Sequence, residues 1–141
     1  MGGGVAYREV DSDDELIEWS REYCRDVRRE WVVDVRFDLV KWEVSHRAKR
    51  RAAAVKRPKL PDAEIGERYD WEAIEEAGGR PLPCKISLTW EGFAGFERAE
   101  WESTLRHELV HIEQYQRDGT TDHGPAFRER AADLETEVHC P

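Results

Sequence analysis

Residues 103–124 read STLRHELVHIEQYQRDGTTDHG, and this stretch decides how the whole chain is interpreted. His107 and His111 are four residues apart, so on a helix both imidazole rings project from one face about one turn apart. Two ring nitrogens at that spacing can bind one Zn²⁺ ion at about 2.0–2.1 Å. The sequence therefore predicts a helix that carries two metal ligands.

A third ligand is needed, because two histidines leave zinc under-coordinated. His123 is the leading candidate, since it follows a glycine-bearing loop that lets the chain turn back toward the helix. Pro125 suits the first position of another helix. Three protein ligands with a fourth position open to water are typical of a catalytic zinc site. We expect one Zn²⁺ ion, although three imidazoles would also bind other divalent metals.

Glu108 is the expected general base. On a helix of 3.6 residues per turn, the two histidines point roughly 200° and 240° away from Leu105, and Glu108 points roughly 300° away. Leu105 belongs to the apolar stripe, so the histidines are predicted to face away from the main core contact. A carboxylate beside the metal can accept a proton from the attacking water without being a ligand. The competing interpretation is a chance HELVH on a solvated helix face, but the periodic helix, the intact glutamate and the downstream histidine favour a metal site.

The remaining patterns predict an α+β domain with one small sheet. Ser12 and Glu15 form a capping box, and apolar residues follow at helical spacing. Val33 and Val35 belong to an alternating, strand-like run. The segment 47–57 is ambiguous, because its alanines favour a helix whereas its place in the order suits a strand that pairs with the first. The predicted elements are a helix over 13–30, strands over 31–42 and 84–90, a long connection over 57–83 with a short helix at 70–77, a helix over 98–117, and a last helix that begins at Pro125.

The chain has 141 residues, which suits a flexible tail over 1–11 and a single domain over 12–141. Its three cysteines are far apart and form no CxxC pair, which argues against a disulfide framework and a cysteine zinc cluster. No apolar run approaches 18 residues, and the N-terminus has no hydrophobic signal segment. We expect a cytoplasmic monomer without a membrane partner.

The net charge of −9 argues against nucleic-acid binding by the whole surface. The chain has 17 arginines but five lysines, a balance that favours a halophilic protein and also fits an ordinary acidic protein from a GC-rich genome. One local segment is basic and free of acidic residues, and its members are Arg47, Lys49, Arg50, Arg51, Lys56, Arg57 and Lys59. The segment either follows phosphates, with Trp42 stacking on a base, or is a solvated strand face.

Two other histidines are not expected to bind metal. His46 lies among basic residues, and His139 lies near the end of the chain beside Cys140. Neither has enough nearby ligand residues in the sequence to form a metal site.

The pattern HELVH…HGPAF, with His107–His111 followed by His123–Phe127, resembles the SprT-like family of zinc metallopeptidases, which includes Spartan. The resemblance covers about residues 12–138 and is most specific over 105–127. It implies a zincin-like minimal metalloprotease core, with a small antiparallel or mixed sheet packed on the HExxH helix between N- and C-terminal helices. It also implies that His107, His111 and His123 bind zinc and that Glu108 is the base.

In Spartan-like members the activity is proteolysis of proteins covalently trapped on DNA, a DNA repair activity switched on by DNA. Many members also carry a C-terminal zinc ribbon with paired cysteines, and this sequence shows no such pair. The resemblance therefore supports the peptidase chemistry more directly than the DNA-linked substrate.

Three hypotheses follow. The chain is a zinc endopeptidase directed to protein on DNA, with single-stranded DNA as a partner, or a zinc hydrolase that acts on unrelated or damaged proteins without DNA. The third hypothesis is a non-catalytic zinc module that binds nucleic acid or a protein partner through residues 47–59. Glu108 disfavours the third, because a structural site has no use for a general base. A peptide substrate is expected to pair with an exposed sheet edge, for which residues 85–90 are the candidate.

Overall fold

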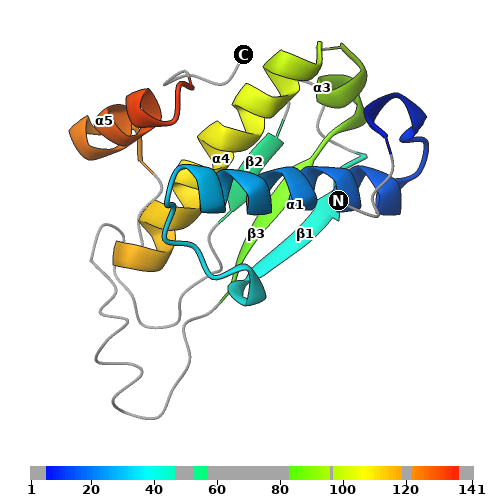
Figure 1. Cartoon of the computed structure of the whole chain (residues 1–141). Coiled ribbons are helices and arrows are strands. Elements are labelled where there is room, and N and C mark those ends of the chain that lie inside the picture. The colour runs from blue at the N-terminus through cyan, green and yellow to red at the C-terminus, as the bar shows by residue number, and fades with distance from the viewer. Residues whose placement is uncertain (1–5, 47–52, 57–82, 96, 119–121, 137–141) are drawn as a thin grey trace.

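The computed structural model describes residues 6–46, 53–56, 83–95, 97–118 and 122–136. The described chain has an α+β fold in which helices pack on a small mixed sheet (Figure 1). The elements in chain order are α1 (Asp13–Glu30), β1 (Val40–Val44), β2 (Ala53–Lys56), β3 (Cys84–Leu88), α3 (Trp90–Gly95), α4 (Arg98–Asp118) and α5 (Pro125–Asp133), with short 3₁₀ helices at Tyr7–Glu9 and Phe37–Leu39. The predicted α+β class and the single small sheet are confirmed.

Helix α1 begins and ends where the sequence predicts. The Ser12 hydroxyl accepts a hydrogen bond from the backbone N–H of Glu15 at 3.2 Å, and the Glu15 carboxylate accepts one from the backbone N–H of Asp11 at 3.2 Å. The first bond satisfies a backbone donor that the first helical turn cannot pair internally, and the second holds the residue before the N-cap against that turn. The apolar face of the helix, which includes Leu16 and Val27, is buried in the core.

The strand order is β1-β3-β2, with β1 parallel and β2 antiparallel to β3. The predicted pairing of the second strand with the first is therefore wrong, because β2 pairs with β3. The sequence alone carries no signal for this strand order. Hydrophobic alternation indicates which face of a strand is buried, but it does not indicate which other strand pairs with it.

The first strand is shorter and later than its alternation predicts. Val33 and Val35 are both 4% exposed, but β1 begins only at Val40. The segment before it binds side chains of α4: the backbone N–H of Asp34 donates to Glu113 Oε2 at 2.9 Å, and that of Arg36 donates to Gln116 Oε1 at 2.8 Å. The alternating valines are thus buried without a strand partner, because α4 side chains satisfy the backbone.

Part of the predicted flexible tail packs against the core. The Tyr7 ring lies 4.8 Å from Trp19 and 4.6 Å from Phe93, between ring centroids, and Val10 is buried. Residues 6–11 therefore differ from the loose tail expected over 1–11. Residues 1–5, the connection over 57–82 and its short helix at 70–77 lie outside the described residues.

The two faces of the sheet have different chemistry. Ile86 and Leu88 of β3 are fully buried and share one hydrophobic cluster with residues of α1 and α4. Lys85 and Ser87 alternate with them and therefore point to the opposite face. The strand predicted to reach residue 90 ends at Leu88, since the Thr89 hydroxyl accepts the backbone N–H of Gly92 at 3.0 Å and Trp90 begins α3.

Helix α4 is the centre of the fold, because it contacts α1, α3, α5, β2 and β3. Its predicted stripe is confirmed, since Trp101, Leu105, Leu109 and Ile112 are all fully buried. Helix α5 is held over it by Arg106, which donates to the carbonyl oxygen of Leu134 at 2.8 Å and to the Tyr23 hydroxyl at 2.7 Å. No helix among the described segments combines the length and the apolar character needed to cross a bilayer.

Candidate metal centre

The structure brings the three predicted ligands together. His107 and His111 project from one face of α4, and His123 precedes α5, which folds back over that helix. The Nε2 atom of His123 lies 3.1 Å from Nε2 of His111 and 3.5 Å from Nε2 of His107. One ligand atom from each residue lies within 4.8 Å of the others, so the group could hold a metal ion.

The two helical histidines are buried, although ideal helix geometry places them away from the apolar stripe of α4. His107 is 3% exposed and His111 is 6% exposed, whereas His123 is exposed. The reason is Phe127 of α5, which stacks on the His111 ring with centroids 4.3 Å apart and contacts the His107 ring at 5.1 Å. A helical wheel of α4 alone cannot show this cover, because α5 supplies it.

Burial also sets the protonation of the centre. The pKa of His111 is lowered from its ordinary 6.5 to about 4, mainly by desolvation and in part by the charges of His107 and His123, while the hydrogen bond with Gln114 opposes the shift. His111 is therefore neutral at pH 7. A neutral imidazole is the form that binds metal.

Two residues that sequence reasoning missed surround the histidines. The Gln114 side chain lies between His111 and Asp122: its Oε1 atom is 3.2 Å from His111 Nδ1, and its Nε2 atom donates to Asp122 Oδ1 at 2.7 Å. Asp122 Oδ1 also accepts the backbone N–H of Gly124 at 3.1 Å. A signal was present in the sequence, because Gln114 follows His111 by three residues on the same helix face and Asp122 directly precedes His123.

Glu108 is also buried, at 3% exposure. Burial raises the pKa of the Cys24 thiol on α1, and the negative charge of Glu108 contributes further to that rise, so the carboxylate lies near this thiol. On α4, Glu108 is 100° around the helix from His107 and 60° from His111 by ideal geometry of about 3.6 residues per turn. Ideal helix geometry thus places the buried side chain of Glu108 next to the two histidines of α4.

The donor set fits a divalent transition metal. Three neutral imidazole nitrogens suit zinc, and also copper, nickel and iron, whereas magnesium and calcium prefer oxygen. The model of the SprT-like family matches residues 15–141, which is nearly the whole chain. The chain belongs to the SprT-like family. Comparisons with curated proteins and with solved structures found no match.

Of the two other histidines of this SprT-like chain, His46 is described and is not part of the group. His46 Nε2 lies 2.8 Å from Asp13 Oδ2, and the other oxygen of that carboxylate accepts the indole N–H of Trp90 at 2.7 Å. This carboxylate ties the end of β1 to the starts of α1 and α3. His139 lies outside the described residues.

Of the predicted basic segment of this SprT-like chain, Lys56 alone is described, and it is exposed at the end of β2. The members that lie outside the described residues are Arg47, Lys49, Arg50, Arg51, Arg57 and Lys59. Lys56 is the register partner of Lys85, and Lys41 is the partner of Lys85 on the other side. Three of the five lysines in the chain therefore lie in one row across the sheet.

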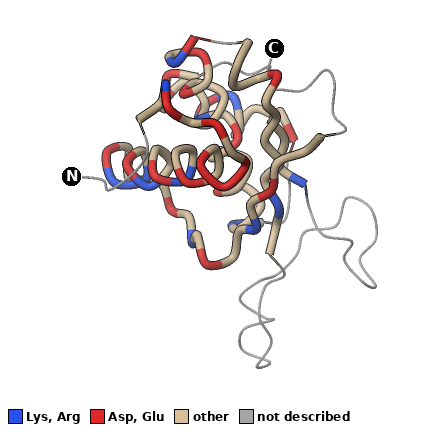
Figure 2. The backbone as a smooth tube through the Cα atoms, turned by 90° about the vertical axis from the view of Figure 1, so that its right-hand side faces the viewer, with Lys and Arg blue, Asp and Glu red and all other residues tan. Residues whose placement is uncertain are grey.

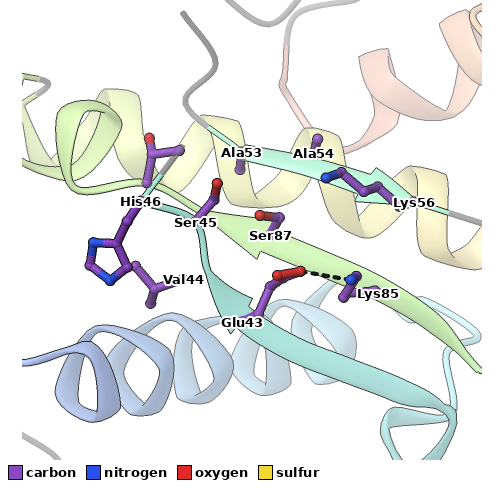
Figure 3. Close-up of a pocket in the computed structure, with 10 residues that line it drawn as sticks. Glu43, Val44, Ser45, His46, Ala53, Ala54, Lys56, Lys85 and Ser87 are labelled. Atoms are coloured by element: carbon purple, nitrogen blue, oxygen red, sulfur yellow. Dashed lines mark ion pairs between the residues drawn. The ribbon is translucent and has the colours of Figure 1, made fainter. Parts of the chain in front are cut away.

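A groove of about 650 Å³ lies on this face of the sheet (Figure 3). Lys56 and Ser87 line it, and Lys85 Nζ forms an ion pair with Glu43 Oε1 at 2.9 Å within it. Figure 2 shows acidic and basic positions interspersed along the described chain, so the row of lysines is a local feature.

Proposed function

We propose that this SprT-like protein is a zinc-dependent endopeptidase. The observation that carries the proposal is the convergence of three imidazole nitrogens, within 4.8 Å of one another, beside the buried Glu108. Membership of the SprT-like family supports it. A purely structural site would gain nothing from a buried carboxylate that is not a ligand, because burying a charge is costly.

In this proposal His107, His111 and His123 hold one Zn²⁺ ion. A bound zinc ion supplies a Lewis acid that lowers the pKa of water toward about 7 and polarises a carbonyl group. Glu108 takes a proton from the water that attacks the peptide carbonyl and delivers it to the departing amine. Phe127 covers the rings of His107 and His111, which keeps solvent from one side of the centre and fixes the two rings.

We propose that the peptide substrate lies along β2. The edge expected over residues 85–90 is wrong, because β3 is the central strand and pairs with both β1 and β2. Among the described strands, β2 lies at the edge of the sheet and also contacts α4, which carries the histidines. An extended peptide can pair with the backbone of such an edge.

A substrate bound to DNA is the finer form of the proposal. The row of Lys41, Lys85 and Lys56 supports it, since like charges in register destabilise a sheet and an anionic partner would offset that repulsion. The same row favours the second candidate function, a non-catalytic zinc module that binds nucleic acid through this face and residues 47–59. Catalysis by Glu108 separates the two candidates.

The test is cleavage of an unfolded protein substrate in high salt, with and without single-stranded DNA. Glu108→Gln should lower the rate by about 10²–10⁴-fold while zinc remains bound, because the amide cannot accept the proton. Glu102→Gln is the matched control: Glu102 lies on the same helix, pairs with Arg98 at 3.4 Å and is not part of the histidine group, so its variant should cut as fast as wild type.

Glu108-dependent cutting that increases with DNA supports the DNA-directed peptidase. Glu108-dependent cutting that does not respond to DNA supports a peptidase of unfolded or damaged protein. If wild type and Glu108→Gln both hold zinc and neither cuts any substrate, the peptidase proposal is wrong and the zinc module takes its place.

A further inference from the structure

Three hydrogen bonds connect the ligand on α4 with the ligand that precedes α5. They run from the His111 ring to the Gln114 amide, from that amide to the Asp122 carboxylate, and from the carboxylate to the backbone N–H of Gly124. Gln114 is 5% exposed, and a buried amide that lacks its partners would be costly. Gly124 and Asp122 flank His123, so the last bond closes a turn around the third ligand.

The carboxylate fixes the direction of the whole series. The Gln114 NH₂ group donates to Asp122 Oδ1 at 2.7 Å and therefore faces the carboxylate. The Gln114 oxygen must then face His111, and an amide oxygen only accepts as well. The His111 ring therefore carries a proton on Nδ1, which donates to that oxygen. In this tautomer the unprotonated nitrogen is Nε2, which lies 3.1 Å from Nε2 of His123 at the centre.

We propose that Gln114 and Asp122 are positioning residues that set the tautomer of His111 and the place of His123 together. This inference rests on the proposed function only in taking the histidines as metal ligands. Residues that hold a ligating histidine in this way commonly change metal affinity by about 10–100-fold when they are removed. His111 is buried whereas His123 is exposed, so Asp122 couples the less enclosed ligand to the enclosed one.

Gln116 provides a matched control on the same helix. Its side chain also makes two hydrogen bonds, to the backbone N–H of Arg36 at 2.8 Å and to the carbonyl oxygen of Arg36 at 2.9 Å. Gln116 is two residues from Gln114 but does not contact the histidines through these bonds. Gln116→Leu should lower stability without changing the metal centre, which separates loss of packing from loss of positioning.

The first measurement is the tautomer of His111 in the metal-free protein, read from ¹⁵N–¹H correlation spectra of the imidazole rings. Wild type and Gln116→Leu should show the proton on Nδ1. Gln114→Leu and Asp122→Ala should show a mixture of tautomers, because the first removes the acceptor and the second lets the amide rotate. Asp122 is exposed, so its variant keeps the test valid if Gln114→Leu does not fold.

The second measurement is Zn²⁺ affinity by competition with a chromophoric chelator. Gln114→Leu and Asp122→Ala should each weaken affinity by about 10–100-fold. The double variant, which carries both Gln114→Leu and Asp122→Ala, should bind Zn²⁺ about as tightly as the single variant with the lower affinity. Either change alone already breaks the same series of hydrogen bonds. Asp122→Asn should restore affinity to within about threefold of wild type, since its amide oxygen can still accept both hydrogen bonds.

The inference is wrong if His111 keeps its proton on Nδ1 in folded Gln114→Leu and Asp122→Ala. It is also wrong if both variants bind zinc as tightly as wild type. A wild-type protein that binds no zinc would overturn the proposed function, and the imidazole spectra would still decide whether Gln114 and Asp122 orient His111.

Discussion

The histidine centre and the face of the sheet that carries Lys85 and Lys56, here called the open face, place polar side chains in opposite environments. His107, Glu108 and His111 are at most 6% exposed, and Phe127 contacts all three histidine rings. On the open face, Glu43 and Lys85 form their ion pair with side chains 35% and 45% exposed. Burial makes each contact in the first region expensive to change, whereas water can replace the contacts in the second.

The difference indicates where geometry is fixed and where it is adjustable. A buried imidazole can occupy one orientation, because an unsatisfied nitrogen would lose its hydration without compensation. An exposed lysine can follow a partner, because its long side chain keeps its hydration in many rotamers. The centre therefore suits chemistry that needs fixed distances, and the face suits contact with partners of varied shape.

The largest expected difference between the histidine centre and the open face is in how much one side chain contributes to the free energy of unfolding. Phe127 is 1% exposed and touches all three histidine rings, so Phe127→Ala should lower the free energy of unfolding by about 3–5 kcal/mol. Lys56→Ala on the open face should change it by less than about 0.5 kcal/mol. Urea denaturation of the metal-free proteins measures both. If Phe127→Ala and Lys56→Ala lowered the free energy of unfolding equally, the packing of α5 over the histidine centre would contribute little to stability.

The pH dependence of stability tests whether the His111 ring of the centre is buried in its neutral form. The folded-state pKa of His111, about 4, is below its ordinary 6.5. Between these two pH values the unfolded chain therefore binds a proton at His111 that the folded chain does not bind. The stability from neutral His111 is fully present above pH 6.5 and falls as the pH drops toward 4. The loss should reach about 3 kcal/mol at the low end. Thermal unfolding in the presence of a chelator should show this decline in wild type.

The matched comparison is the difference between wild type and His111→Gln across the same pH range. The substitution removes the titrating ring, so the variant should lack this part of the decline, while the titration of carboxylates remains in both proteins. Parallel curves for the two proteins would contradict the burial of a neutral ring.

The smallest expected difference is between two ion pairs. Arg130 and Glu113 pair at 2.9 Å with side chains 27% and 12% exposed, next to the segment that precedes β1. A double-mutant cycle should give a coupling free energy of about 1–3 kcal/mol for this pair. The cycle for Glu43 and Lys85 should give less than about 1 kcal/mol and decline in concentrated salt. A salt-resistant coupling on the open face would mean that the groove is drier than its exposure indicates.

Local signals in the sequence predict α1 and α4 well, but they miss the short helix α3. The capping box at Ser12 and the apolar spacing after it predict α1 to the residue, and the stripe through Leu105 predicts α4 to within one residue at its end. Strands are predicted less well, because alternation reports burial of one face and not the partner that completes the hydrogen bonds. Val33 and Val35 illustrate this, since α4 side chains take the place of a neighbouring strand.

In the candidate site, too, local spacing in the sequence predicts some features, whereas others depend on packing between elements. The spacing of His107, His111 and His123 is enough to predict that they converge, because the helix and a short return loop determine it. The burial of His107 and His111 depends on Phe127 of another helix, and the proposed roles of Gln114 and Asp122 depend on distances between segments. These features arise from packing, which a periodic pattern on one element does not describe.

The central position of α4 has a consequence for the response of the chain to a ligand. A helix that packs against five other elements cannot open alone, so exchange of its inner amide hydrogens requires unfolding of the whole core. Any ion bound by His107 and His111 stabilises the folded state by RT ln(1 + [L]/Kd), and this gain is shared by the entire cooperative unit. A metal ion bound there would therefore slow amide exchange throughout the sheet and α1 as well as around the three histidines.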